Sequence, residues 1–333
     1  MKDAVKFLYF HIKPYKWWYF LILQAPILTG FYSVLNYYSF KLIVDEISSG
    51  ANPAKISLAV AIFFSANIFL DISWRISNFA ERKSEPFVRK NIILDVYNHV
   101  TRLDYSYFQN TQSGAIISKM KGILDGYDSV FSNLHSKTLC YFCWAIFPLF
   151  ALFFVNYTIA TFMLFWCLIF FAVMFPMVKK MSIFSGIEGD EKHKIFGSLA
   201  DNVANIFAIL NFAKQKQEHK KLENAIENGF VKAQIAMYKY DFKFQIVGII
   251  LYWPMVAFVF LFMLKCRKSG IISSGDFIFV LSTVITTISF NLWMFVTHLA
   301  DFMKEMGDFR SSFSIMKAQR STLDKKDAKI LVI

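Results

Sequence analysis

The sequence predicts an all-α membrane protein that crosses the bilayer six times and carries long helical extensions on one side. Of its 333 residues, 56% are hydrophobic and only 18% are charged, whereas soluble domains contain about a quarter charged residues. The net charge of +12 could indicate nucleic-acid binding. Lys and Arg lie, however, in blocks between apolar runs, as is typical of membrane topology, so we expect no nucleic-acid partner.

The expected elements follow one another along the whole chain. Residues 1–16 mix Lys with apolar residues and predict an amphipathic elbow helix in the membrane interface. The membrane domain covers residues 17–320, and a tail covers 321–333. Its six spans are expected at approximately residues 17–44, 55–80, 136–155, 158–178, 244–264 and 277–300.

The second span has an unusual pattern. Its uncharged part, residues 56–70, is short for a crossing, and Asp71 and Arg75 follow at i,i+4, where they can pair on one helix face. The helical pattern then continues through Arg89 and Lys90. We therefore predict a helix that leaves the membrane and runs on into water.

The third and fourth spans form one uncharged run, because residues 138–178 contain no Lys, Arg, Asp or Glu. A single helix of that length would exceed ~30 Å of hydrocarbon about twofold. We expect two spans joined by a tight turn near Asn156 and Tyr157.

The sequence favours no metal, redox or catalytic centre. Cys140 and Cys143 have C-x-x-C spacing, but they lie in an uncharged run without a neighbouring His or carboxylate. The six histidines are scattered, and no Ser-His-carboxylate grouping is evident. We expect no catalytic residue and no cofactor or metal bound by this chain.

Two segments outside the spans carry unusually many apolar residues. Tyr105, Tyr107 and Phe108 lie in an aromatic insert, residues 104–121, between two long helical patterns. This insert is either a docking knob or a hairpin turn whose aromatic side chains pack on their own helices. A second apolar cluster lies within the polar helical segment 182–243 and consists of Ile206, Phe207, Ile209, Leu210 and Phe212.

The distribution of basic residues orients the chain. Of the 36 Lys and Arg, only Lys55, Lys265, Arg267 and Lys268 fall in loops assigned to the outside. Both termini and both apolar segments are therefore expected on the cytoplasmic side, in a bacterial inner membrane. The cluster at residues 265–268 is the one local violation.

Taken in order, these motifs resemble the transmembrane domain of a type I ATP-binding cassette (ABC) exporter half-transporter. FLYFHIKPYKWWYF looks like the elbow helix and first span, and LDYSYFQNTQSGAIISKM looks like the first intracellular loop. SLADNVANIFAILNFAKQKQEHKKLE looks like the second intracellular loop, and MGDFRSSFSIMKAQ looks like the exit of the sixth span. The family usually has Glu at the position of Asp201 and Gly near Asn205, and it often has a small-residue pair where Ser311 and Ser312 stand.

The resemblance implies the permease part of an ATP-driven exporter, in which both cytoplasmic loops couple to nucleotide-binding domains. It implies a homo- or heterodimer with a second transmembrane domain, surrounded by membrane lipids. The residues that it implies in coupling are Tyr105, Tyr107, Phe108, Gln109, Gly114, Asn205, Ile206, Phe207, Ile209 and Leu210.

The sequence contains no G-x-x-x-x-G-K-[ST] phosphate loop, so no ATPase site is expected in this chain. ATP and Mg are expected to act through a nucleotide-binding domain, either on a separate chain or lost by truncation. Two alternatives remain: a non-transporting relic or truncated product of a transporter gene, and an integral-membrane lipid enzyme. The enzyme would need His or carboxylates clustered at one interface, and the sequence shows no such cluster.

Polar residues inside the predicted spans are the candidates for the substrate path, because an intramembrane ionisable residue indicates function by default. Asp71 and Arg75 can instead neutralise each other, and His298 can be an interfacial or helix–helix contact. We expect an apolar or amphipathic substrate, such as a lipid, a drug-like molecule or a peptide. The six candidates are Asn36, Asn67, Asp71, Arg75, Asn291 and His298.

Overall fold

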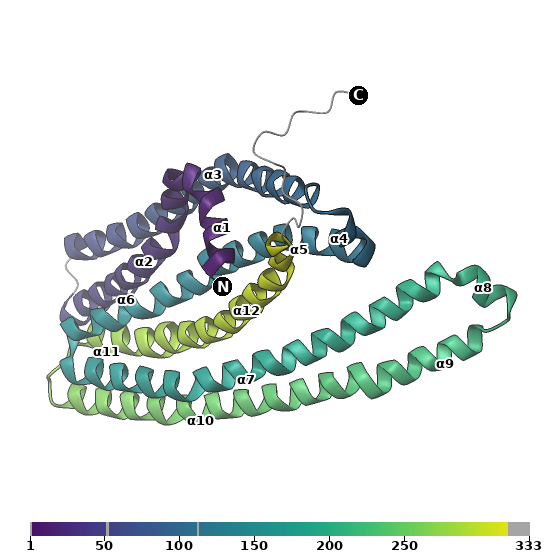
Figure 1. Ribbon diagram of the computed structural model, residues 1–333. Helices are drawn as coiled ribbons and strands as arrows, with labels where there is room; N and C mark the ends of the chain where they lie inside the picture. Colours follow the sequence, from purple (N-terminus) through teal and green to yellow (C-terminus); the bar gives the residue numbers. More distant parts are fainter. Residues whose placement is uncertain (1, 51–52, 112, 319–333) are drawn as a thin grey trace.

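The computed structural model describes residues 2–50, 53–111 and 113–318. This part of the chain is almost entirely helical and contains no strand, and its helices form an elongated bundle (Figure 1). The helices are α1 (Lys2–Ile12), α2 (Lys16–Ser49), α3 (Pro53–Val100), α4 (Tyr105–Asn110), α5 (Ser113–Ser132), α6 (Cys140–Val155), α7 (Tyr157–Ala204), α8 (Ile206–Asn211), α9 (Gln215–Ala225), α10 (Lys232–Lys268), α11 (Ser274–Leu281) and α12 (Ser289–Phe313). Short 3-10 helices, η1 (Lys13–Tyr15) and η5 (Ser314–Lys317), and π-helical stretches, η2 (Asn133–Leu139), η3 (Ile226–Val231) and η4 (Ser282–Ile288), join or extend them.

Among the described residues, 6 helical segments are long and apolar enough to cross a membrane. This confirms the expected all-α fold class with six spans. The expected tail, residues 321–333, lies outside the described residues. The six segments are Asp3–Ser49, Pro53–Val100, Ile116–Val155, Tyr157–Ala204, Gln215–Lys268 and Ser274–Lys317.

Two predicted features of these spans are confirmed. α3 continues without a break over 48 residues, far beyond the length that a bilayer needs. The long uncharged run divides at Asn156, where the backbone is extended and the side-chain Oδ1 accepts the Ile159 N–H at 3.1 Å. This N-cap gives the Ile159 N–H a hydrogen-bond partner that the first turn of the helix cannot provide, and α7 begins at Tyr157.

The buried residues form two clusters. The span core joins α6, α7, α10 and the α11–η4–α12 segment around side chains such as Met163, Val259 and Ile288. The elbow core joins α1, α2, α3, α5 and the last turns of α12, and it includes Ile123 and Phe309. The sixth span therefore links the two cores, because α12 contributes to both.

Small residues allow close approach of the helices outside the span core. The buried face of α3 toward α2 includes Ala59, Ala66, Ser73, Ser77, Ala80 and Ser84, the composition expected where helices pack in lipid without a hydrophobic driving force. On α5, a Cβ at Gly126 would overlap the Phe309 side chain, and a Cβ at Gly122 would overlap Ser312. The small side chain of Ser312 in the MGDFRSSFSIMKAQ motif is thus explained by its contact with α5.

One end of the bundle is closed by polar contacts between α2 and α11. Lys41 Nζ lies 3.0 Å from Asp45 Oδ2 and 3.1 Å from Asp276 Oδ1, and the Gly275 N–H donates to Asp45 Oδ1 at 2.7 Å. In the neighbouring loop, the Arg267 guanidinium donates to the Ile272 carbonyl and to Ser274 Oγ. At least one member of the basic cluster at 265–268 therefore has a local role in shaping this loop.

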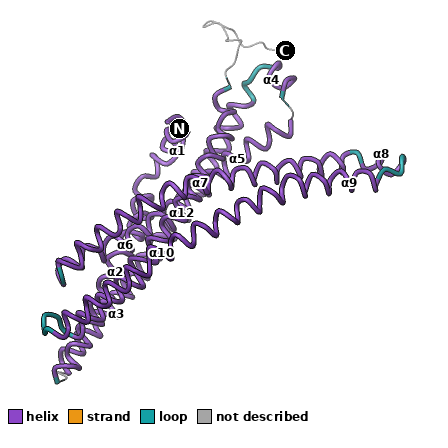
Figure 2. Tube along the Cα trace, turned by 90° about the horizontal axis from the view of Figure 1, so that it is seen from below, coloured by secondary structure: helices purple, strands orange, loops and turns teal. Residues whose placement is uncertain are grey.

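At the other end, the molecule divides. α7 and α10 lie side by side and form an arm that carries α8 and α9 away from α4 (Figures 1 and 2). Ring pairs join the two helices of the arm, at Phe162 with Phe258 and at Phe184 with Tyr240. The arm packs on α6 and α12 through the span core, and its far part extends away from the other described helices (Figure 2).

The close contact of α5 with α12 leads to a stability prediction. We expect Gly126→Ala to destabilise the protein by about 1–3 kcal/mol, because the added methyl overpacks the Phe309 contact. The matched control is Gly197→Ala on α7, where a Cβ meets nothing within 4 Å. That change should stabilise the helix by up to about 1 kcal/mol. Thermal unfolding in detergent measures both, and equal effects would contradict the close packing of α5 on α12.

Candidate coupling ends and an aromatic cavity

The first apolar insert folds as α4, a short helix that connects α3 to α5. Tyr105 is 76% exposed and Phe108 is 40% exposed, whereas Tyr107 packs against the elbow core. Gln109 is also exposed, and Gly114 belongs to α5. Tyr107 thus packs back, as the hairpin-turn interpretation expects, whereas the rings of Tyr105 and Phe108 face outward.

The second apolar cluster folds as α8 at the tip of the arm. Phe207 is 78% exposed, Ile206 and Leu210 are also exposed, and Ile209 is half-buried. Asn205 makes the corner between α7 and α8, because its backbone N–H and its side-chain Nδ2 both donate to the Asp201 carbonyl. This amide ends the helix at the place where the family usually has Gly nearby.

The turn after α8 contains a backbone conformation that is unusual for its residue. Ala213 has φ of 51°, in the left-handed region that favours Gly. The Lys214 N–H donates to the Ile209 carbonyl at 2.9 Å, and the Ala213 N–H donates to the Leu210 carbonyl at 3.1 Å. These two bonds form a Schellman motif, so they hold the Ala213 backbone in place against its intrinsic preference.

α4 and α8 lie toward the same end of the molecule, at the ends of unbroken helices (Figure 1). Phe212, which follows α8, is 75% exposed and extends the apolar tip. Each tip therefore presents a small apolar surface at the end of a rigid rod. Such a surface can dock into a groove of a partner and transmit a displacement along the rod.

The structure does not gather the six substrate-path candidates into one site. No hydrogen bond or ion pair between described residues joins any two of them. Tyr32 Oη donates to Asn67 Oδ1 at 3.1 Å, and His298 stacks on Tyr141 and lies 3.6 Å from Asp301. Asn36 and Asn291 each bury a side-chain oxygen that lacks a protein partner.

The possible Asp71–Arg75 pair is absent, which corrects one sequence-based interpretation. Both side chains are exposed on α3, and no ion pair connects them in the described part of the chain. Spacing of i,i+4 allows contact but contributes only a few tenths of a kcal/mol, so it does not fix two long or exposed side chains.

Sequence reasoning missed an aromatic cavity of about 330 Å³ between α7, α10 and the η4–α12 segment. Trp166, Tyr252 and Trp293 line it, together with smaller residues such as Gly248 and Ser289. Trp166 Nε1 donates to the Leu251 carbonyl at 3.1 Å, which fixes one wall of the cavity. The lining comes from three separate stretches of sequence between Trp166 and Trp293, so no local motif could have indicated the cavity.

The Schellman turn gives a prediction for the arm tip. We expect Ala213→Gly to stabilise the turn by up to about 1 kcal/mol, since Gly adopts the left-handed conformation without steric cost. Hydrogen exchange at the amides of α8 and α9 should slow. As a control, Ala208→Gly within α8 should speed exchange, because Gly weakens a helix interior. Faster exchange in both variants would contradict the turn geometry.

Comparison with known proteins agrees with the geometry. The protein-family model that describes the ABC transporter transmembrane region matches residues 19–290 of this chain. The chain is also similar to an ATP-dependent lipid A-core flippase from Desulfotalea psychrophila, with 23% identity over 236 residues. That alignment covers 69% of this chain and 40% of the flippase, so the chain spans well under half of that relative. On the family match, this integral, multi-pass membrane chain belongs to the ABC transporter transmembrane-region family.

Proposed function

We propose that this chain is the substrate pathway of an ABC exporter and couples to nucleotide-binding domains through α4 and α8. The observation that supports this most is the pair of exposed apolar tips, Tyr105 with Phe108 and Phe207 with Leu210, on unbroken helices. ATP and Mg would be bound by the nucleotide-binding domains, and this chain would convert their closure into movement of the spans.

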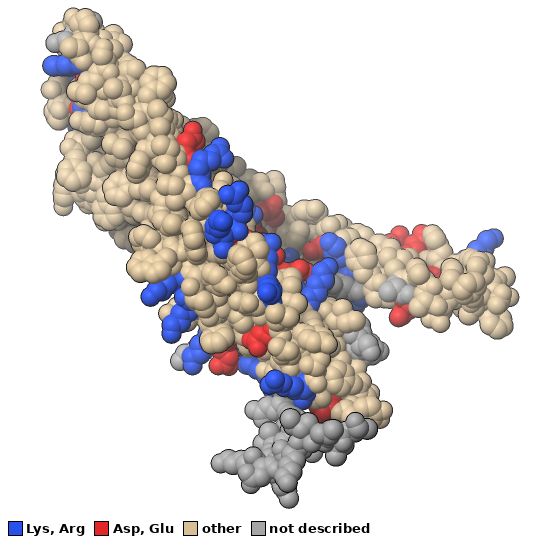
Figure 3. Space-filling model, turned by 90° about the horizontal axis from the view of Figure 1, so that it is seen from above, with Lys and Arg blue, Asp and Glu red and all other residues tan. Residues whose placement is uncertain are grey.

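The proposed orientation places both termini, α4 and α8 in the cytoplasm of a bacterial cell, with the spans in the inner membrane. Figure 3 supports it, because Lys and Arg on the face drawn there gather over the middle of the molecule, whereas the upper left part shows few charged residues apart from those at its tip. Basic residues accumulate on the cytoplasmic side of membrane proteins. The similarity to a lipid A-core flippase agrees with this location.

A second transmembrane domain, identical or related, would complete the pathway. The arm supports this part of the proposal, since its cytoplasmic extension exposes large apolar side chains such as Phe196, Val203, Tyr238 and Phe242. In water these side chains would favour burial against another chain.

The proposed movement is an alternation between two arrangements of the bundle. In this structure the α2–α11 contacts close one end, while the arm separates α8 from α4 at the other. Approach of the two nucleotide-binding domains would draw the tips together and lever the spans apart at the closed end. In this proposal, the structure described here, with the α2–α11 end closed and the tips apart, corresponds to the inward-facing state.

The proposed substrate is an apolar or amphipathic molecule, with a lipid as the class that the observations favour. The aromatic cavity offers an apolar lining with few polar groups, as expected for a site that receives an acyl chain or a ring system. The name of the relative, a lipid A-core flippase, points to the same class. The main alternative is a relic that kept the bundle and no longer transports.

The coupling role can be tested with the most exposed ring of each tip. We expect Tyr105→Ala with Phe207→Ala to abolish co-purification of a nucleotide-binding ATPase in mild detergent, together with vanadate-sensitive ATP turnover. Mass spectrometry of the purified protein identifies the partner. The control is Phe154→Ala, which removes a 92% exposed ring at the α6–α7 turn, far from both tips. Retained ATPase binding in the double variant would disprove the coupling assignment, and absence of any ATPase from the native protein would favour the relic.

The lipid assignment can be tested by filling the cavity. We expect Ile285→Phe to weaken quenching of tryptophan fluorescence by phospholipids with brominated acyl chains at least several-fold, because the larger side chain occupies the space beside Trp293. Ile278→Phe is the control, since Ile278 belongs to the same span and does not line the cavity. Equal quenching in both variants would remove the cavity from the substrate path.

A further inference from the structure

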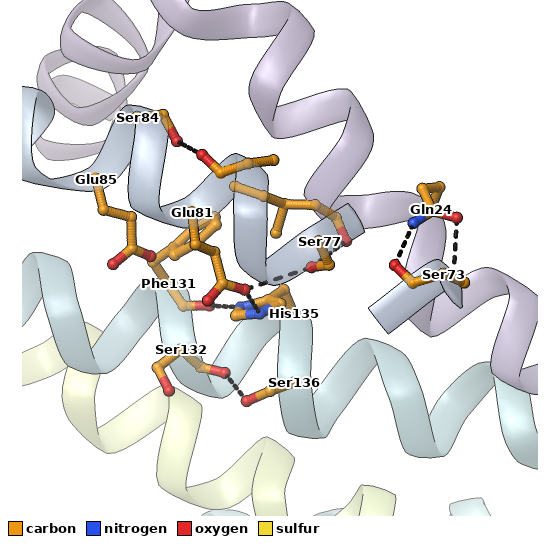
Figure 4. A network of polar contacts seen from close by, with 12 residues as sticks. Gln24, Ser73, Ser77, Glu81, Ser84, Glu85, Phe131, Ser132, His135 and Ser136 are labelled. Carbon is orange, nitrogen blue, oxygen red and sulfur yellow. Dashed lines mark hydrogen bonds and ion pairs between the residues drawn. The ribbon is translucent and has the colours of Figure 1, made fainter. Parts of the chain in front are cut away.

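His135 lies in an environment that constrains its protonation. The side chain is buried, with the whole residue only 6% exposed, on the π-helical stretch η2. Its Nε2 lies 3.0 Å from Glu81 Oε1 on α3, and its Nδ1 lies 3.1 Å from the Phe131 carbonyl oxygen (Figure 4). The Phe131 ring stacks on the imidazole at 4.8 Å between ring centroids, which limits rotation of the side chain.

Both ring nitrogens therefore face acceptor groups. A carbonyl oxygen only accepts, and an ionised carboxylate only accepts, whereas a neutral imidazole donates from one nitrogen alone. With neutral His135 and ionised Glu81, one nitrogen of the buried ring would face acceptor lone pairs, whereas the Glu81 side chain itself is 27% exposed. The hydrogen bonds are satisfied together only if the pair holds one further proton, on the ring or on Glu81.

Among the described residues, no other side chain supplies Glu81 with a short hydrogen bond. Ser77 Oγ lies 3.4 Å from Glu81 Oε1 and 3.3 Å from the Ile22 carbonyl, and its single proton can serve only one of these acceptors. Figure 4 shows Ser77 between the α2 backbone and Glu81. His135 is thus the principal hydrogen-bond partner of this carboxylate.

The surrounding charges favour an added positive charge. Three cations lie near the pair on α3: Arg82 and Lys83 lie over the Phe79 ring, and Arg89 is paired with Glu85 at 3.0 Å and with Asp128 at 2.8 Å. Burial raises the pKa of both Glu85 and Asp128, and the Arg89 guanidinium opposes that rise. An imidazolium at His135 would be a further cation among three carboxylates.

The remaining titratable groups around the pair come from four elements, α2, α5, η2 and α12. Tyr19 of α2 and Tyr127 of α5 bond to each other through their hydroxyl groups. Asn133 of η2 donates to Glu305 of α12 at 3.4 Å, and Lys137 follows one turn after Asn133 on η2. The two tyrosines and Glu305 have contacts of their own, so the proton shared by Glu81 and His135 is not assigned to any of them.

We propose that Glu81 and His135 form a proton-binding site at the edge of the membrane-spanning bundle. The bound proton joins α3 to η2 directly, and Ser77 extends the contact to α2. Loss of that proton to water leaves one ring nitrogen facing acceptor lone pairs, either at Glu81 or at the Phe131 carbonyl, so the packing around His135 loses one hydrogen bond. The site makes packing of the first three spans depend on pH, whether or not the chain transports.

The protonation state can be measured by ¹⁵N NMR of histidine-labelled protein in detergent at pH 7. The chain contains six histidines, and comparison with His135→Gln assigns the signal of interest. Protonation of both ring nitrogens supports the proposal. A neutral ring protonated at Nδ1, with an infrared carboxyl band that disappears in Glu81→Gln, also supports it. A neutral ring without that band overturns it.

The pH dependence of unfolding gives a second test with a variant that should fold. In Glu81→Gln, the amide can donate to Nε2 while Nδ1 donates to the Phe131 carbonyl, so no extra proton is needed. An unfolded histidine loses its proton near pH 6.5, so a folded site that keeps its proton above this pH, as proposed, loses stability as the pH rises.

We expect the wild-type melting temperature to fall by several degrees more than that of Glu81→Gln between pH 6 and pH 9. The matched control is Glu223→Gln, an exposed site on α9, which should keep the wild-type slope. Equal slopes in wild type and Glu81→Gln would overturn the proposal.

Discussion

The backbone of a membrane-spanning segment has to satisfy its own hydrogen bonds, because hydrocarbon provides no partners. The other features of this structure depend on that constraint. It makes every span a helix, and a helix that continues past the bilayer becomes a stiff rod. α3 and α7 each continue for 48 residues, so α4 and α8 lie at the ends of rods that are anchored in the span region. A displacement at either tip can therefore reach the spans.

Two kinds of contact hold the bundle together: hydrogen bonds, whose strength depends on angle, and apolar packing, whose strength does not. α2, α3 and α5 meet through small residues and through directional bonds, such as those of Ser77, Glu81 and His135. The arm of α7 and α10 meets the rest of the chain through the largely apolar span core and the aromatic cavity. Apolar contacts tolerate sliding better than hydrogen bonds do, since they lack a preferred angle. The arm is accordingly the part best suited to move, and the elbow region the part best suited to stay rigid.

Strain and polar groups concentrate where the helices change direction or meet. The left-handed Ala213 lies at the tip of the arm, Asn205 makes the corner before α8, and Asn156 starts α7. Each solves the same problem, because a helix end leaves backbone donors or acceptors without intrahelical partners. The polar pair of Glu81 and His135 lies beside the π-helical stretch η2. The positions that look least regular in the sequence thus mark helix ends and contacts between helices.

By itself, the sequence determined the all-α class, the six spans, the break at Asn156 and the two apolar tips. These features depend on local hydropathy, charge and turn chemistry, which act over a few residues along the chain. Tertiary structure alone decided that Tyr107 packs inward, that Asp71 and Arg75 do not pair, and that Glu81 meets His135 across 54 positions. It also decided the aromatic cavity, whose lining comes from α7, α10 and the η4–α12 segment. The physical reason is the same in each case. Side-chain pairs and cavities depend on which helix faces come together. A hydropathy pattern shows that one face of a helix is buried, but it does not show which other helix packs against that face.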